Sequence, residues 1–331
     1  MPFVAAIMIA FVVSSAAAAD SSVPQPDSSL ATYAKPGELV DIGGRKLNLR
    51  CSGSGSPVVV LESGANADSL TWMLVQPLIA KSTRVCSYDR AGYGFSDEGP
   101  LPRSVDADAA DLDALIRAAH LKTPVVVVGH SLGTNIVRRY ADRHAANVAG
   151  IVLVDPWPQH ISEFSSEWVK TDNEMRAGMI AFASQCAKGA EKGELAKPTK
   201  DLEKCIRPGD PHYPDALNAA IHARKEKPAF WHTLISESQS NMVVFEEPIA
   251  PKESHGAIPL IVLTADSAFD DAPPDGKKAL EAARQKTHKL LVATSTRGER
   301  RWVAQSTHDM QLDQPTAVAT AVVDVIKMSA H

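Results

Sequence analysis

The sequence has no excess of basic residues. It contains 34 Lys and Arg against 39 Asp and Glu, which gives a formal net charge of -5. This balance excludes the broad basic surface by which many proteins bind nucleic acid. The chain also lacks the Walker A pattern, a dinucleotide-binding fingerprint and any Cys and His spacing typical of zinc sites. We therefore expect no nucleic-acid partner, no cofactor and no metal.

The composition is otherwise that of an ordinary globular protein. Hydrophobic residues make up 44% and charged residues 22% of the 331 positions. Low-complexity disorder, collagen and coiled coil are therefore excluded for the chain as a whole. A chain of this length can bury about three quarters of the surface that it exposes when unfolded, so core size sets no limit.

The N-terminus carries the pattern of a secretory signal. Residues 3–13 form a continuous apolar run, and Ala17-Ala18-Ala19 fit the small-x-small rule for cleavage. We expect residues 1–19 to be a cleaved signal peptide, although no Lys or Arg precedes the run and an uncleaved anchor is the alternative. Residues 20–36, rich in Ser and Pro, would then be a flexible leader. This predicts a secreted or periplasmic protein with no membrane span after cleavage, and the sequence identifies no protein partner.

Most of the remaining chain alternates between strand and helix patterns. Runs of Val, Ile and Leu without polar alternation are typical of strands that helices cover on both faces of a parallel sheet. We expect such strands at 57–64, 83–89, 125–131, 148–155, 259–266 and 300–306. We expect helices at 68–80, 104–120, 134–145, 276–290 and 315–328. A short hairpin with paired glycines at its turn is expected at 38–49.

The alternation stops after Pro156 and resumes near Ile258. The intervening stretch contains scattered helical patterns and no strong strand. We therefore expect a helical insert, residues 157–257, between two parts of one α/β core, residues 37–156 and 258–331.

The segment Gly129-His130-Ser131-Leu132-Gly133 has the pattern Gly-x-Ser-x-Gly between a strand and a helix. In this context the pattern predicts a sharp turn that exposes the serine hydroxyl at the carboxyl edge of the sheet. The two glycines leave room for neighbouring backbone, and the helix N-terminus behind the turn favours negative charge. Ser131 is therefore the candidate nucleophile.

A serine hydroxyl needs a base and an oxyanion hole to act as a nucleophile. His308 is the best-placed base because it follows the last strand and precedes the final helix, at the edge where the serine lies. His130 adjoins the serine, and we interpret it as structural. For the oxyanion we expect the backbone N–H groups of Leu132 and Ala65, with Asn66 as the second choice.

These segments together resemble an α/β-hydrolase with a cap domain. The resemblance rests on 61–72, 87–97, 125–133, 148–156 and 306–315. It implies an eight-stranded, mostly parallel sheet in which the third and fourth strands exchange places, with a mostly helical lid after the sixth strand. It also implies that the loop 89–97 shapes the floor of the site. Epoxide hydrolases and haloalkane dehalogenases carry aspartate at the nucleophile position, so Ser131 argues against both.

The chain departs from the family pattern at two positions. Ser63 stands where a histidine often precedes the oxyanion glycine, and the usual acid position after the seventh strand falls on Ala268. Asp266 lies near that position, whereas Asp155, at the end of the sixth strand, is where some lipases carry their acid. A carboxylate at either place could reach the far nitrogen of the histidine, or could simply cap a turn. Both aspartates are therefore candidates for the catalytic acid.

The four cysteines allow three pairings, and their spacing does not choose among them. The strand order implied by the resemblance makes the strands that contain Cys51 and Cys86 neighbours, which favours a bridge between them. Cys186 and Cys205 would then pair within the insert. Four free buried thiols are the alternative.

The sequence thus predicts a serine hydrolase that cleaves a carboxylic ester of a small molecule through an acyl-enzyme on Ser131. An acyltransferase or a small-peptide or lactone hydrolase is one alternative, and a non-catalytic small-molecule binding protein is another. Asn66 and Trp157 are the candidates for substrate contact. The insert's aromatic residues would either line an acyl pocket or form the insert's own core: Trp157, Phe164, Trp168, Phe182, Phe230 and Trp231.

Overall fold

The computed structural model describes residues 30–206, 208–270 and 272–330. The predicted signal peptide, residues 1–19, lies outside these residues, as does most of the predicted leader. The leader was predicted to stay flexible as far as Pro36, but Leu30–Ala34 form a short 3-10 helix. The side chain of Leu30 is buried, and this short helix packs against α5 (Asp215–Lys225).

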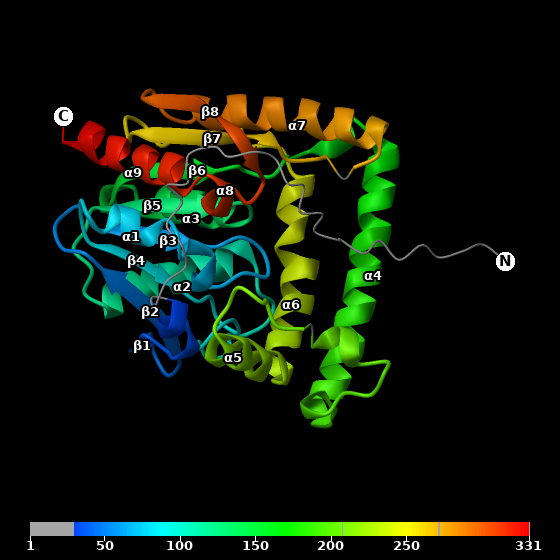
Figure 1. Cartoon of the computed structure of the whole chain (residues 1–331). Helices are drawn as coiled ribbons and strands as arrows, with labels where there is room; N and C mark the ends of the chain where they lie inside the picture. The colour runs from blue at the N-terminus through cyan, green and yellow to red at the C-terminus, as the bar shows by residue number, and fades with distance from the viewer. Residues whose placement is uncertain (1–29, 207, 271, 331) are drawn as a thin grey trace, which may run out of the picture.

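An eight-stranded sheet forms the centre of the molecule (Figure 1). Its order is β1-β2-β4-β3-β5-β6-β7-β8, and only the pairings of β1 with β2 and of β2 with β4 are antiparallel. The strands are β1 (Glu38–Asp41), β2 (Lys46–Ser52), β3 (Val59–Glu62), β4 (Val85–Tyr88), β5 (Val125–His130), β6 (Val148–Val154), β7 (Leu260–Ser267) and β8 (Gly298–Thr307). The predicted fold class and strand order are confirmed.

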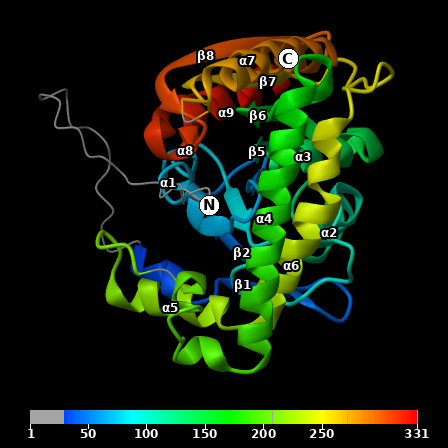
Figure 2. The ribbon, with the colours of Figure 1, turned by 90° about the vertical axis from the view of Figure 1, so that its right-hand side faces the viewer.

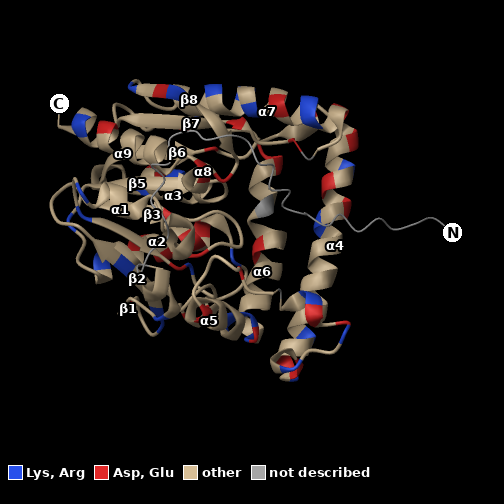
Figure 3. Cartoon of the chain, in the orientation of Figure 1, with Lys and Arg blue, Asp and Glu red and all other residues tan. Residues whose placement is uncertain are grey.

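Helices cover both faces of this sheet. One face packs against α2 (Val105–Ala118) and α3 (Gly133–Arg143). The other packs against α1 (Gln76–Ile79) and α9 (Pro315–Ser329). The remaining core helices are α7 (Pro274–Ala293) and α8 (Met310–Asp313). Basic and acidic residues are interspersed along α7, as Figure 3 shows.

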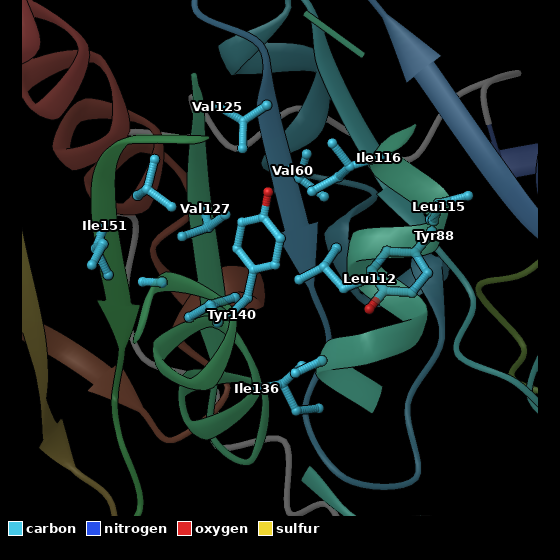
Figure 4. Packing of buried hydrophobic residues seen from close by; sticks show 14 of the residues in the cluster. Val60, Tyr88, Leu112, Leu115, Ile116, Val125, Val127, Ile136, Tyr140 and Ile151 are labelled. Atoms are coloured by element: carbon cyan, nitrogen blue, oxygen red, sulfur yellow. The ribbon is translucent and has the colours of Figure 1, made fainter. Parts of the chain in front are cut away.

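The central position of β5 in the sheet explains why its sequence shows no alternation of polar and apolar residues. Val125 and Val127 belong to the core cluster under α2 and α3, where Figure 4 shows Val127 beside Tyr140. Val126 and Val128 belong to the cluster on the opposite face. Each of these four valines is fully buried. Burial of one aliphatic side chain stabilises a fold by about 1.5–3 kcal/mol. Because side chains on both faces of β5 are buried, apolar residues are favoured at every position and the sequence shows no polar alternation.

The segment between β6 and β7 contains α4 (Ser166–Glu191), α5 and α6 (Pro228–Ser240). Figures 1 and 2 show that α6 lies next to the core and that α4 lies outside it. Aromatic side chains hold α4 to α6, because Trp231 is buried and makes edge-to-face contacts with Phe182 and Phe230. Trp231 thus belongs to the insert's own core, whereas Phe182 is exposed and Phe230 packs on that core and also lines a cavity.

The four cysteines form two disulfides, Cys51–Cys86 and Cys186–Cys205. Cys51 and Cys86 are direct partners in the register of β2 and β4. Both predicted bridges are confirmed. In the described part of the chain no helix is long and apolar enough to cross a membrane.

Candidate active site

The turn between β5 and α3 holds Ser131 in a backbone conformation that side chains rarely adopt. Its φ is 51°, and its N–H donates to the carbonyl of Val154 at the end of β6 (3.1 Å). A Cβ atom on Gly133 would lie 2.6 Å from the carbonyl oxygen of Ser63, and one on Gly129 would collide with the backbone of Gly133. Both glycines are therefore required for the turn that presents this serine.

His308 follows β8 and reaches the end of β6. Its Nδ1 lies 2.7 Å from Oδ2 of Asp155. The other carboxylate oxygen, Oδ1, accepts a hydrogen bond from the N–H of Ala265 (3.0 Å) and lies 3.6 Å from Nη1 of Arg284. With Nδ1–H donating to the carboxylate, Nε2 of His308 carries the free lone pair that a general base needs.

Asp155 is almost fully buried, with 1% of its surface exposed. Burial alone would raise the pKa of this carboxyl, but the hydrogen bond and charge of His308 and the Ala265 N–H outweigh burial and lower the pKa. The carboxylate is therefore ionised at neutral pH. An ionised carboxylate here can orient the imidazole and stabilise its protonated form.

The other candidate acid, Asp266, lies elsewhere. It is exposed on β7, where its two oxygens accept from Nε1 of Trp302 (3.2 Å) and from the N–H of Gln305 (3.3 Å). No hydrogen bond within the described chain joins it to His308. Of the two candidate acids, the structure pairs Asp155 with His308, whereas Asp266 pairs with Trp302 and Gln305 of β8.

His130 supports the backbone of the histidine. Its Nε2 lies 2.8 Å from the carbonyl oxygen of His308, and the two rings are 4.8 Å apart. Since a carbonyl only accepts, Nε2 of His130 carries the proton. Burial lowers the pKa of His130 to about 4, so the ring is neutral at pH 7.

The loop after β3 lies directly over the serine. A Cβ atom on Gly64 would be 3.3 Å from Cβ of Ser131 and 2.9 Å from Nδ1 of His130. The N–H groups of Ala65 and Leu132 donate to no other group among the described residues. The N–H of Asn66, in contrast, donates to Oε2 of Glu237 (2.8 Å). Ala65 and Leu132 therefore offer free donors near the serine, whereas the N–H of Asn66 is already used.

Arg90 holds this loop from behind, and sequence reasoning did not identify it. Nη1 donates to the carbonyl of Ser63 (2.6 Å) and Nη2 to the carbonyl of Gly64 (2.7 Å). Its carboxylate partners are Glu62 (2.7 Å) and Glu237 (2.8 Å). Its position in the glycine-rich loop 89–97 was the only available signal. No local pattern indicates that a residue of α6 would meet it.

A further buried histidine, His288, interacts electrostatically with Asp155. His288 of α7 lies 2.8 Å from Oγ1 of Thr264 through Nδ1 and 2.8 Å from the carbonyl of Pro156 through Nε2. Nε2 therefore carries the proton. Burial lowers the pKa of His288 to about 4, so this ring is also neutral at pH 7.

Beside the loop lies a cavity of about 280 Å³. Its lining includes Asn66, Tyr93, Phe230 and Leu312. Trp157 lies edge-on to the ring of His308 at 5.1 Å. The site thus combines a serine, a histidine, a buried carboxylate and free N–H donors. The cavity borders the loop after β3 through Asn66, and neither Ser131 nor His308 is among its lining residues.

Comparisons with known proteins agree with this architecture. A family model described as alpha/beta hydrolase fold matches residues 57–190. The protein YqjL of Bacillus subtilis is 34% identical over 104 residues, which cover 31% of this chain and 41% of YqjL. The chain spans less than half the length of the curated relatives it matches.

Two solved structures illustrate the range of chemistry on this fold. An esterase from Thermogutta terrifontis superposes with a TM-score of 0.58 at 16% identity, covering 90% of this chain and all of the esterase. An epoxide hydrolase from Bacillus megaterium superposes with a TM-score of 0.60 at 14% identity, covering 88% of this chain and all of the epoxide hydrolase. These similarities show the fold of the chain. They do not identify the bond that it cleaves.

Proposed function

We propose that the chain is a serine hydrolase of the α/β-hydrolase superfamily that cleaves a carboxylic ester of a small molecule. The family model over residues 57–190 and the shared fold of solved hydrolases support this assignment. The observation that carries the proposal is the pairing of His308 with the buried, ionised Asp155. The ring of His308 lies 4.8 Å from that of His130, the residue that precedes Ser131 in its strained turn. Epoxide hydrolysis is not favoured, because the hydroxyl of Ser131 stands where that chemistry uses a carboxylate.

In the proposed reaction, Oγ of Ser131 attacks the acyl carbonyl while Nε2 of His308 takes the hydroxyl proton. The N–H groups of Ala65 and Leu132 stabilise the oxyanion that forms. The imidazolium, stabilised by Asp155, then returns the proton to the leaving alcohol. Water attacks the acyl-enzyme in the same way and releases the acid.

We further propose that residues 157–257 act as a cap over this site. The support is that α6 contacts the loops that follow β3 and β4 through Glu237, at the carboxyl edge where Ser131 lies. The two disulfides favour an oxidising compartment and so support export to the periplasm or the cell exterior.

The proposal is tested with a fluorophosphonate probe and a substrate panel. We expect the probe to label Ser131 in the folded protein and the Ser131→Ala variant to remain unlabelled. Turnover is measured on p-nitrophenyl esters of increasing chain length, beside an amide and a lactone. No labelling of folded protein would favour a non-catalytic binding protein, and turnover of the amide or lactone alone would replace the ester assignment.

A further inference from the structure

Glu237 of α6 connects the cap to the loop over Ser131. It is 171 residues from Asn66 in sequence, yet its Oε2 accepts the Asn66 N–H at 2.8 Å. The same carboxylate accepts from the hydroxyl of Tyr93 (3.0 Å) and from Nη2 of Arg90 (2.8 Å). Glu237 is 2% exposed, so a buried carboxylate from α6 satisfies three donors of the core.

Arg90 connects Glu237 to the peptide that carries the oxyanion donor, the N–H of Ala65. The carbonyl of Gly64 accepts from Nη2 of Arg90, the same nitrogen that pairs with Glu237. In a trans peptide the carbonyl and the following N–H point in opposite directions. The N–H of Ala65 therefore points away from Arg90. Because this turn lies on the side chain of Ser131, fixing the Gly64 carbonyl also fixes the direction of the Ala65 donor.

The hydrogen bond between Asn66 and Glu237 restrains the next peptide, which joins Ala65 to Asn66. The φ of Asn66 is 53°, a left-handed conformation that is costly for a residue other than glycine. The hydrogen bond from its N–H to Glu237 holds it in that conformation. Glu237 thus restrains the peptides on both sides of Ala65, one directly and one through Arg90.

We propose that Glu237 is a positioning residue through which docking of α6 sets the geometry of the oxyanion hole. When α6 withdraws, the Asn66 N–H loses its acceptor and Arg90 loses one of its two carboxylates, so the Ala65 donor is no longer held. Hydrolysis would then depend on a closed cap. This inference rests on the proposed function, since it assigns regulation to that same site.

Helix α6 has other contacts that should keep it docked when Glu237 is changed. Ser236 accepts from the N–H of Arg103 (2.8 Å), and Asn241 donates to Asp108 (2.9 Å). Thr233 packs so closely on Gly92 that a Cβ atom there would collide with it. A variant at position 237 therefore tests the contact with the loop rather than the presence of the helix.

The experiment compares Glu237→Gln and Glu237→Asp with Glu191→Gln, in the full-length protein. Glu191 is a matched control because it is also a cap glutamate, but it is exposed and its partner is the half-buried His232. For Glu237→Gln we expect kcat on a p-nitrophenyl ester to fall about tenfold to hundredfold with KM unchanged. A misaligned donor should lower kcat by no more than complete removal of that donor would. Affinity for a trifluoromethyl ketone, which forms an oxyanion on the serine, should fall by the same factor. Glu191→Gln should match wild type.

Glu237→Asp separates positioning from charge. Aspartate keeps the negative charge for Arg90 but is one methylene too short to reach Asn66. If Glu237 only neutralises Arg90, Glu237→Asp will recover wild-type kcat and the proposal is overturned. If positioning matters, kcat will stay low.

Hydrogen exchange gives a readout that does not depend on turnover. We expect exchange in a peptide containing residues 63–68 to be faster in both Glu237 variants than in wild type, and unchanged in Glu191→Gln. Wild-type exchange in both Glu237 variants would refute the proposal even if either fails to turn over substrate. If wild type itself shows no hydrolysis, the proposed function fails, while this measurement still decides whether Glu237 holds the loop.

Discussion

Replacement of Asp155 by asparagine tests the proposed mechanism most sharply, because the structure determines how the new amide must sit. One carboxylate oxygen accepts from the N–H of Ala265 and the other faces Nδ1 of His308. The Ala265 N–H requires an acceptor, and Arg284 stands 3.6 Å from the same oxygen. The amide oxygen should therefore occupy that place and the NH₂ group should face the histidine.

In that orientation the amide donates to Nδ1 of His308, so the ring must carry its proton on Nε2. A protonated Nε2 has no lone pair with which to take the proton of Ser131. We expect kcat to fall by about four orders of magnitude, or about 5.5 kcal/mol of transition-state stabilisation, with KM little changed. The fold should persist, because the amide is nearly isosteric with the carboxylate.

The assay is steady-state hydrolysis of a p-nitrophenyl ester, with circular dichroism to verify folding. Asp266→Asn is the matched control, since Asp266 is an exposed aspartate at the end of the neighbouring strand. Its kcat should stay within about threefold of wild type. The reasoning is refuted if a folded Asp155→Asn protein keeps more than about a tenth of wild-type kcat, or if Asp266→Asn shows the larger loss.

Three further outcomes are expected. Ser131→Ala should fold and lose about six orders of magnitude in kcat, as measured on the same ester; retention of a few per cent would exclude this nucleophile. The free energy of unfolding should decrease as the pH falls from 6.5 toward 4, because unfolding lets His288 and His130 bind protons that the buried rings do not bind; buried Glu62, whose pKa is raised to about 7, offsets only part of the effect of the two rings. A pKa lowered from 6.5 to about 4 corresponds to about 3 kcal/mol for each ring at the end of that range; urea titrations that give equal values at pH 7 and pH 5 would contradict this. Removing the Cys186–Cys205 bridge by a double alanine substitution should cost about 3 kcal/mol in urea unfolding, because the bridge closes a loop across 19 positions, and an unchanged midpoint would show that the bridge adds no stability.

Some of these features follow from local sequence. The apolar runs indicate burial on both faces of a strand, and they predicted a parallel sheet. The strand order, which the resemblance to the α/β-hydrolases implied, is confirmed. The Gly-x-Ser-x-Gly pattern predicts a turn because only glycine fits beside the backbone at its two ends. The disulfide between Cys51 and Cys86 was expected from the strand order that the resemblance implied, and it forms because the two residues are direct partners in the register of β2 and β4.

The tertiary structure alone decided which aspartate meets His308. Both candidates end neighbouring strands, and the choice depends on the backbone conformation of Asp155, whose φ of 41° is not encoded by any pattern of residue types. The contact between Glu237 and Arg90 is similar, because its two members are 147 residues apart and come together only when α6 packs on the core. Periodicity and turn chemistry act over a few residues, whereas the direction of a side chain into a shared site depends on the packing of several elements at once.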